Sequence, residues 1–255
     1  MARHDSSGAE RGGGVQLNHP NMSVSTRTVE DVRTVLKSAR ECDPDNVMSF
    51  YDKWAADYEK DVNAINYQGP NLAADFIFSN FSGSPEEARV LDVACGPGQM
   101  AKLMSEVGFK HFVGVDCSKG MLEEAAKTGL YEDLKQARLG TDPLPAQAGT
   151  FDVVVMVGAL QPNLVPFSVL RDLCNVAKPG GLICLTKAQH RTVSEDFDAA
   201  LERELQLLED EGLWTHVGFK KSDRYMKDSN MMDRESTQDK KFVGGSLFLF
   251  RKLLI

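Results

Sequence analysis

From Arg89 onward, short apolar runs alternate with amphipathic stretches, and this alternation limits the possible folds more than any other feature of the chain. Apolar runs predict strands over 89–94, 112–115, 151–157 and 181–185, and a weaker strand over 136–139. Helical periodicity predicts helices over 99–107, 119–127 and 166–177. Strands that are apolar on both faces and alternate with helices are typical of a parallel sheet covered by helices.

The C-terminal third follows a different pattern. An amphipathic helix is expected over 195–211, and two strands are expected over 214–225 and 242–251, joined by a polar stretch at 226–241. Two late strands joined by a polar loop favour an antiparallel edge. We therefore expect an α/β fold with a seven-stranded sheet, mostly parallel, that contains one antiparallel strand.

The N-terminal part contains no strand signal. Residues 1–25 are rich in Gly, Ser, Asn and Arg, and we expect a flexible tail because they offer little apolar surface to bury. Helices are expected over 28–40, after Pro44, and over 71–81, with Thr28 as a cap of the first. Residues 26–85 would thus form a helical cover on a Rossmann-like core of residues 86–255, in a single domain.

The charge balance narrows the function classes. The chain of 255 residues has 29 basic and 37 acidic residues, a net charge of −8, which disfavours extended nucleic acids as partners. No apolar run reaches the 18 residues that a membrane span needs, and no signal peptide is visible. The five cysteines lack zinc-site or disulfide spacing, so we expect no metal and a cytoplasmic, or also nuclear, location.

The segment 90–99 predicts a ligand site. A strand ends at Ala94, glycines follow at 96 and 98, and a helix begins at Gln99, so that free backbone N–H groups meet an open turn. Asp116, at the end of the next strand, would accept hydrogen bonds from ribose hydroxyls. Nicotinamide dinucleotides and S-adenosylmethionine both fit this pattern. Asp92 favours the second, because a carboxylate beside the turn suits a cation better than a pyrophosphate.

These motifs resemble those of the class I S-adenosylmethionine-dependent methyltransferases. Val90–Gln99 is similar to their first motif and Asp116–Leu122 to their second, and Lys178–Gly181 is similar to the turn before their fifth strand. The helix that carries Tyr51 and Tyr58 resembles the one that covers the cofactor in a subset of the family. The fourth strand lacks the Asn-Pro-Pro-aromatic signature of enzymes that methylate amide or adenine nitrogens.

The resemblance implies that S-adenosylmethionine is the cofactor, and it assigns positions to its parts. Asp92 and residues 94–98 would lie near the methionine part, Asp116 at the ribose, and residues 139–140 at the adenine edge. The full set of implied cofactor-binding residues is Tyr51, Tyr58, Asp92, Ala94, Cys95, Gly96, Gly98, Asp116, Cys117, Met121, Leu139, Gly140, Val157 and Gly158.

The resemblance also implies methyl transfer to a small-molecule or protein acceptor by a monomer. Catalysis rests on holding the acceptor in line, so no catalytic residue follows from the chemistry. His190, after the fifth strand, is a candidate general base, although a solvated loop histidine is the simpler interpretation. A non-catalytic adaptor or sensor that binds the cofactor, and a nicotinamide-dependent oxidoreductase, stay open as alternatives.

Overall fold

The computed structural model describes residues 28–189, 195–228 and 242–254, so the predicted tail lies outside the described residues. The strands are β1 (Arg89–Val93), β2 (His111–Asp116), β3 (Tyr131–Gln136), β4 (Phe151–Val157), β5 (Ala177–Gln189), β6 (Trp214–Lys227) and β7 (Phe242–Lys252). The helices are α1 (Val29–Arg40), α2 (Val47–Ala64), α3 (Gly69–Asn80), α4 (Gln99–Glu106), α5 (Lys119–Ala126), α6 (Val169–Val176) and α7 (Glu195–Asp210).

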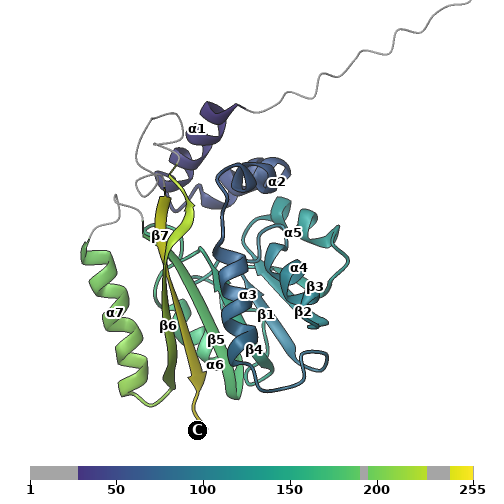
Figure 1. Cartoon of the computed structure of the whole chain (residues 1–255), viewed down its shortest axis with the longest axis vertical. Coiled ribbons are helices and arrows are strands. Elements are labelled where there is room, and N and C mark those ends of the chain that lie inside the picture. The colour runs from purple at the N-terminus through teal and green to yellow at the C-terminus, as the bar shows by residue number, and fades with distance from the viewer. Residues whose placement is uncertain (1–27, 190–194, 229–241, 255) are drawn as a thin grey trace, which may run out of the picture.

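The strands form one sheet in the order β3-β2-β1-β4-β5-β7-β6 (Figure 1). Neighbouring pairs among β1–β5 are parallel, and Val90 of β1 pairs with Phe112 of β2 and Val153 of β4. β7 is antiparallel to both of its neighbours, β5 and β6. Six strands therefore share one direction and one opposes it, which confirms the predicted seven-stranded sheet.

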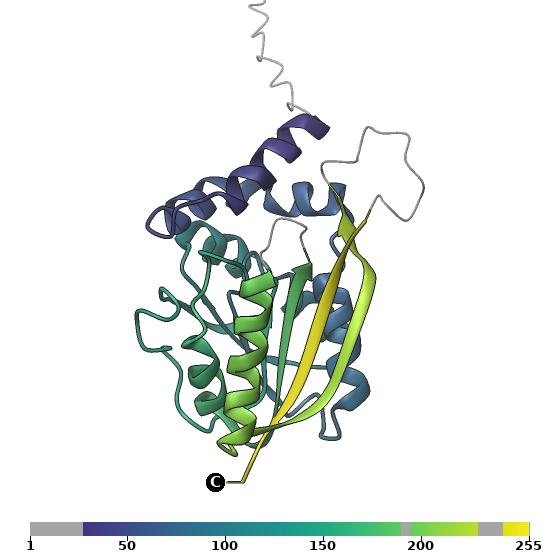
Figure 2. The same cartoon turned by 90° about the vertical axis from the view of Figure 1, so that its left-hand side faces the viewer.

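The two faces of the sheet carry separate apolar cores. Val153 of β4 belongs to the core formed with α3 and α4, which includes Met104. The next residue, Val154, belongs to the opposite core, formed with α6 and α7, which includes Leu170. Figure 2 shows α7 lying along this second face. Because successive side chains point to opposite faces, burial of both faces requires the unbroken apolar runs seen in the sequence.

The third strand differs from the prediction. Strand β3 covers Tyr131–Gln136, whereas a strand over 136–139 is wrong: beyond Gln136 the chain turns, and Leu139 makes only an isolated bridge to Asp142. The reason is that β3 is an edge strand, paired with β2 alone and partly exposed, so charged residues replace the apolar signal. Helix α6 also begins three residues later than predicted, and β5 extends beyond 181–185 at both ends.

Helices α1 and α2 lie across the end of the sheet where β1, β2 and β4 end (Figures 1 and 2). Helix α1 begins with the predicted cap: Thr28 Oγ1 accepts from the backbone N–H of Asp31 at 3.2 Å, and the Asp31 carboxylate accepts in return from Thr28. Helix α3 instead packs on a sheet face, where Ile77 is fully buried. No helix in the described ranges is both long and apolar enough to cross a membrane.

Candidate functional site

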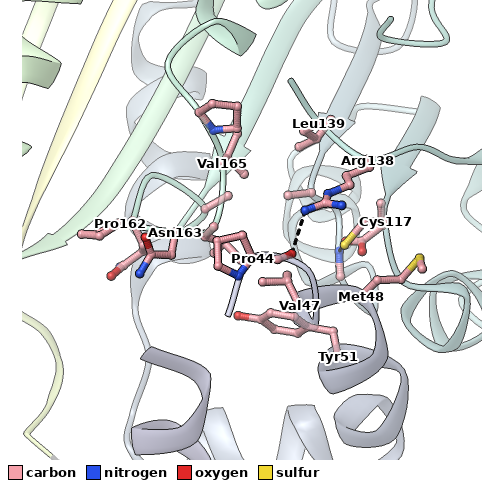
Figure 3. A pocket seen from close by; sticks show the side chains of 18 of the residues that line it. Pro44, Val47, Met48, Tyr51, Cys117, Arg138, Leu139, Pro162, Asn163 and Val165 are labelled. Atoms are coloured by element: carbon pink, nitrogen blue, oxygen red, sulfur yellow. Dashed lines mark hydrogen bonds between the residues drawn. The ribbon is translucent and has the colours of Figure 1, made fainter. Parts of the chain in front are cut away.

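A cavity of about 650 Å³ opens between helix α2 and the carboxyl ends of β1, β2 and β4. In an open parallel sheet, ligands bind at this edge. Figure 3 shows Tyr51 and Val47 of α2 facing Leu139 and Val165 across the space. Of the predicted residues, those that line it are Tyr51, Tyr58, Ala94, Gly96, Asp116, Cys117, Met121, Leu139, Val157 and Gly158.

Four predicted residues do not line this cavity, although each lies within two positions of a residue that does. Cys95 is buried, and its Sγ lies 3.1 Å from where a Cβ on Gly114 would stand; a side chain on Gly98 would meet Tyr131 at 3.0 Å. Gly140 lies against Pro166, where a Cβ would approach to 2.1 Å. Asp92 is buried below the turn. These positions shape the walls behind the cavity surface, and their roles toward a ligand stay predictions.

The glycine turn leaves room for a ligand at one position. Gly96 has a φ of +53°, in the left-handed region, and a Cβ built there meets no atom within 4 Å. The turn is therefore open on the cavity side, where a ligand can approach the backbone directly. Ala94 also has a positive φ of 55°, an uncommon conformation for a residue with a side chain, which is frequent at functional sites.

Asp116 ends β2 and connects two loops of the site. Its Oδ2 accepts from the Gly96 backbone N–H at 2.8 Å, and its Oδ1 accepts from the Ser118 backbone N–H at 2.9 Å. The side chain is buried, and this burial raises its pKa although the backbone hydrogen bonds act in the opposite direction. Each carboxylate oxygen retains a lone pair that can accept from a ligand hydroxyl.

Asp92 occupies the second-to-last position of β1 and accepts a hydrogen bond from the Tyr131 hydroxyl at 2.7 Å. It is only 2% exposed. Burial raises its pKa to about 7, the Tyr131 hydrogen bond lowers it, and the charge of Asp116 raises it further. A second carboxylate therefore lies close to Asp116, and together they give this part of the site a negative potential that favours a cation.

The carboxylate of Asp52, in the N-terminal part of helix α2, holds the helix over the site. Asp52 Oδ1 accepts from the Ser118 hydroxyl at 2.7 Å and from the Gly120 backbone N–H at 3.0 Å, at the start of α5. Burial acts to raise the pKa of Asp52, but these hydrogen bonds outweigh it and lower the pKa. Trp54 is buried, packs against the rings of Tyr51 and Tyr58, and donates at 2.8 Å to Asp61 of the same helix.

Arg138 links the two sides of the cavity and was not predicted as a site residue. Its guanidinium donates to the Pro44 carbonyl at 2.9 Å and to Asp45 at 3.2 Å, so it ties the α1–α2 connection to the loop after β3 (Figure 3). The nearby prediction at Leu139 gave the only sequence signal for it. Other lining residues that the sequence did not predict include Pro44, Val47, Met48, Thr141, Val165, Phe167 and Phe197.

Replacing Arg138 with alanine is expected to loosen the α1–α2 connection with little loss of global stability. The ion pair with Asp45 is exposed on both sides, and such pairs contribute about 0–1 kcal/mol. Hydrogen exchange should therefore rise in residues 41–51 while the unfolding midpoint changes little. Arg171→Ala, which removes a bidentate pair with Glu211 far from the cavity, is the control. Unchanged exchange over 41–51 would show that Arg138 does not restrain the cover.

The other candidates from the sequence separate into two groups. His190 lies outside the described residues, so its position relative to the cavity is not defined. Among the cysteines, Cys117 lines the cavity, and burial raises its pKa to about 12. A thiol with a raised pKa is a poor nucleophile, which agrees with a packing role. The described ranges hold no cluster of three His, Cys, Asp or Glu residues at metal-binding distance.

The sequence matches known proteins over the regions that build this cavity. The methyltransferase domain family model matches residues 90–181. The chain is 46% identical over 169 residues to Methyltransferase-like protein 27 of Homo sapiens, covering 66% of this chain and 67% of the relative. It is 26% identical over 223 residues to Ubiquinone biosynthesis O-methyltransferase of Vibrio cholerae, covering 85% and 88%.

Solved structures share the fold at low sequence identity. The 4+2 cyclase SpnF superposes with a TM-score of 0.61 at 17% identity, covering 84% of this chain and 98% of that protein. An S-adenosylmethionine-dependent methyltransferase from Mesorhizobium loti has a TM-score of 0.51 at 18% identity, covering 72% and 100%.

The segments 92–98, 143–145, 157–160 and 178–181 resemble the methyltransferase-like protein of the Williams–Beuren syndrome chromosome region, and the identity to the human relative confirms that resemblance. The domain match covers the glycine turn, the Asp116 loop and the end of β4. The chain therefore belongs to the class I S-adenosylmethionine-dependent methyltransferases, with S-adenosylmethionine as its cofactor.

Proposed function

We propose that the chain methylates a small molecule and that the cavity between α2 and the sheet is its cofactor site. The observation that carries the proposal is the open turn at Gly96 beside the Asp116 carboxylate, within a cavity of about 650 Å³. Cavities of roughly 300–1,000 Å³ hold ligands of this size. A neighbouring cavity of about 500 Å³, described below, offers space for a small acceptor.

The residues present fit S-adenosylmethionine. Asp116 would accept from the ribose hydroxyls, and Gly96 would let the methionine part approach the backbone, above the Asp92 carboxyl, whose pKa of about 7 leaves it partly charged at neutral pH. Cys117 and Met121 would flank the adenine. When bound, the cofactor supplies an electrophilic methyl group on a positively charged sulfur. The chain's contribution is to orient the acceptor and exclude water, for which α2 and its tyrosines are placed.

Finer statements about the protein are also proposals. A small-molecule acceptor is supported by the acidic net charge and by relatives named for ubiquinone biosynthesis. A cytoplasmic, or also nuclear, location is supported by five cysteines that are all free thiols. A monomer is supported by the exposed large apolar side chains, which come from separate elements: Met48, Phe78, Leu207, Phe219 and Leu254.

One calorimetric titration tests the cofactor assignment. The purified full chain should bind S-adenosylhomocysteine and S-adenosylmethionine and should not bind NAD. Binding of NAD without binding of S-adenosylhomocysteine would overturn the proposal. Incubation of a cell extract with methyl-labelled cofactor then separates an enzyme from a non-catalytic sensor, because only an enzyme labels an acceptor.

A further inference from the structure

Two tyrosines, Tyr67 and Tyr225, join the helical cover to the sheet beside the cofactor cavity. Tyr67 follows helix α2, and Tyr225 lies near the end of β6 and is fully buried. Their rings pack edge to face with centroids 5.5 Å apart, and their hydroxyl oxygens lie 3.4 Å apart. Both line a second cavity of about 500 Å³, which shares Tyr58 and Gly158 with the cofactor cavity. The pair therefore lies where the cover, the sheet and the two cavities meet.

Hydrogen bonds connect Tyr225 to the carboxyl end of β4. The Tyr225 hydroxyl lies 2.6 Å from Thr186 Oγ1 on β5, and Thr186 Oγ1 accepts from the Gly158 backbone N–H at 3.0 Å. Thr186 is fully buried, so water does not compete for these bonds. Gly158 follows β4 directly and has a φ of +73°, in the left-handed region that glycine permits. The Tyr225 hydroxyl thus helps to fix the position of Gly158, which lines the cofactor cavity.

The backbone of β6 holds the loop between α2 and α3 at the same place. The Gln68 N–H donates to the Tyr225 carbonyl at 2.8 Å, and the Lys227 N–H donates to the Ile65 carbonyl at 2.7 Å. Residues 65–68 therefore lie against the end of β6. These contacts fix the C-terminal end of α2, the helix that places Tyr58 over the cofactor cavity.

Three glycines leave the space that the two tyrosine rings occupy. A Cβ on Gly158 would stand 2.3 Å from the Tyr67 hydroxyl oxygen, and one on Gly69, at the start of α3, would stand 2.6 Å from it. A Cβ on Gly245 of β7 would stand 2.2 Å from the Tyr225 ring. Close-packed interiors do not accommodate overlaps of this size, so a side chain at any of the three would displace a tyrosine. Backbone from α3, from the end of β4 and from β7 therefore fits around this pair.

Gly158 lies on the opposite side of the glycine turn from Asp116. In the sheet, β1 separates β2, which ends in Asp116, from β4, which precedes Gly158. A cofactor whose ribose is held by Asp116 and that passes the open turn at Gly96 brings its methionine part toward Gly158. The tyrosine pair is thus placed to affect the methionine end of the cofactor and not the adenosine end.

We propose that Tyr67 and Tyr225 are positioning residues of the cofactor site, which hold Gly158 and the end of α2 together around the methionine part. The inference rests on the proposed function, because it takes the first cavity as the cofactor site. Neither hydroxyl touches the reacting atoms, since each acts through Gly158 or through the cover. Burial raises the pKa of Tyr225 to about 12 and that of Tyr67 well above its usual value, so both stay neutral hydrogen-bonding groups.

Two ligands separate the ends of the site. S-adenosylhomocysteine contains the amino-acid part, whereas methylthioadenosine keeps the adenosine and the sulfur and lacks that part. Tyr67→Phe and Tyr225→Phe should each weaken S-adenosylhomocysteine binding roughly 3–10-fold, the effect of losing one neutral hydrogen bond. Methylthioadenosine binding should stay unchanged. Calorimetry measures the first ligand and ligand-observed NMR the second. An equal loss for both ligands, or no loss for S-adenosylhomocysteine, would overturn the proposal.

A suppressor pair tests the contact between Tyr67 and Gly158. Gly158→Ala should weaken S-adenosylhomocysteine binding roughly 10–100-fold, because its Cβ would overlap the Tyr67 hydroxyl and its φ disfavours a side chain. Adding Tyr67→Phe removes that oxygen, and the next ring atom, Cζ, lies 3.5 Å from the Cβ position. The double variant should therefore bind about threefold or more tighter than Gly158→Ala. No recovery would show that Tyr67 does not set the position of Gly158.

Trp214→Phe is the matched control, because it also removes a buried hydrogen bond, at the opposite end of β6 from Tyr225. Trp214 Nε1 donates to the Leu205 carbonyl at 3.2 Å. The variant should lower the unfolding midpoint and leave the affinity for both ligands unchanged. A loss of S-adenosylhomocysteine affinity in Trp214→Phe would assign the tyrosine effects to general destabilisation and overturn the proposal. Failure of the unaltered chain to bind S-adenosylhomocysteine would instead refute the proposed function.

Discussion

Replacing Asp116 with alanine is expected to weaken S-adenosylhomocysteine binding roughly 10–150-fold, about 1.5–3 kcal/mol. The carboxylate lines the cofactor cavity and would accept from the ribose hydroxyls. It also holds the Gly96 and Ser118 backbone N–H groups at 2.8 and 2.9 Å, so alanine would loosen the turn that the methionine part approaches. Calorimetry at pH 7.5, with circular dichroism to establish folding, measures the effect.

The control for Asp116 is a carboxylate of the same kind at the opposite end of the sheet. Asp152, near the start of β4, accepts from the Arg89 backbone N–H at 2.9 Å and pairs with Lys178. Asp152→Ala should cost stability and leave cofactor affinity intact. Asp116→Asn keeps one acceptor oxygen and should fall between the native chain and the alanine variant. Unchanged affinity in folded Asp116→Ala, or an equal loss in Asp152→Ala, would remove the ribose role.

The parts of the fold that the sequence predicted best are those in which local pattern and burial agree. Strand β4 is apolar throughout because both of its faces are covered, and the turn after β1 needs glycine for its backbone conformation. The range of strand β3 was not predicted correctly, because an edge strand is half solvated and this one carries charge at Glu132, Asp133 and Lys135. Burial on two faces gives a strong sequence signal, whereas one-sided burial in a short edge strand does not.

The residues of the site also divide into those that local sequence pattern predicts and those that it does not. Asp116 and Gly96 belong to one strand–turn–helix pattern and its neighbour, so spacing along the chain was enough to predict them. Arg138 reaches Pro44 across 94 positions, and Tyr67 meets Tyr225 across 158. Contacts of this kind depend on how the cover sits on the sheet and on the register of β6 with β7. Single-sequence periodicity carries no information about either.

Replacing Asp92 with asparagine is expected to stabilise the protein above pH 7 and to weaken cofactor binding. The buried carboxyl has a pKa of about 7, against 3.8 for an ordinary aspartate. An acid whose pKa is raised by folding binds its proton more tightly in the native state, so the native chain loses stability as pH rises from about 4 to 7. Three pKa units set an upper limit of about 4 kcal/mol, and asparagine removes this cost while still accepting from Tyr131.

The pH dependence of the free energy of unfolding distinguishes removal of a buried charge from a general packing effect. Thermal unfolding should show Asp92→Asn more stable than the native chain at pH 8, by roughly 1–4 kcal/mol, with the difference shrinking toward pH 4. Tyr131→Phe should act in the opposite direction at pH 8, because it leaves the carboxylate without its 2.7 Å donor.

Affinity for S-adenosylmethionine should fall in Asp92→Asn, since a negative charge that favours the cation is gone. A variant that loses stability at pH 8, or whose gain does not change with pH, would show that Asp92 is not the buried acid inferred here. A gain in stability with unchanged affinity would instead confine Asp92 to a structural role below the turn.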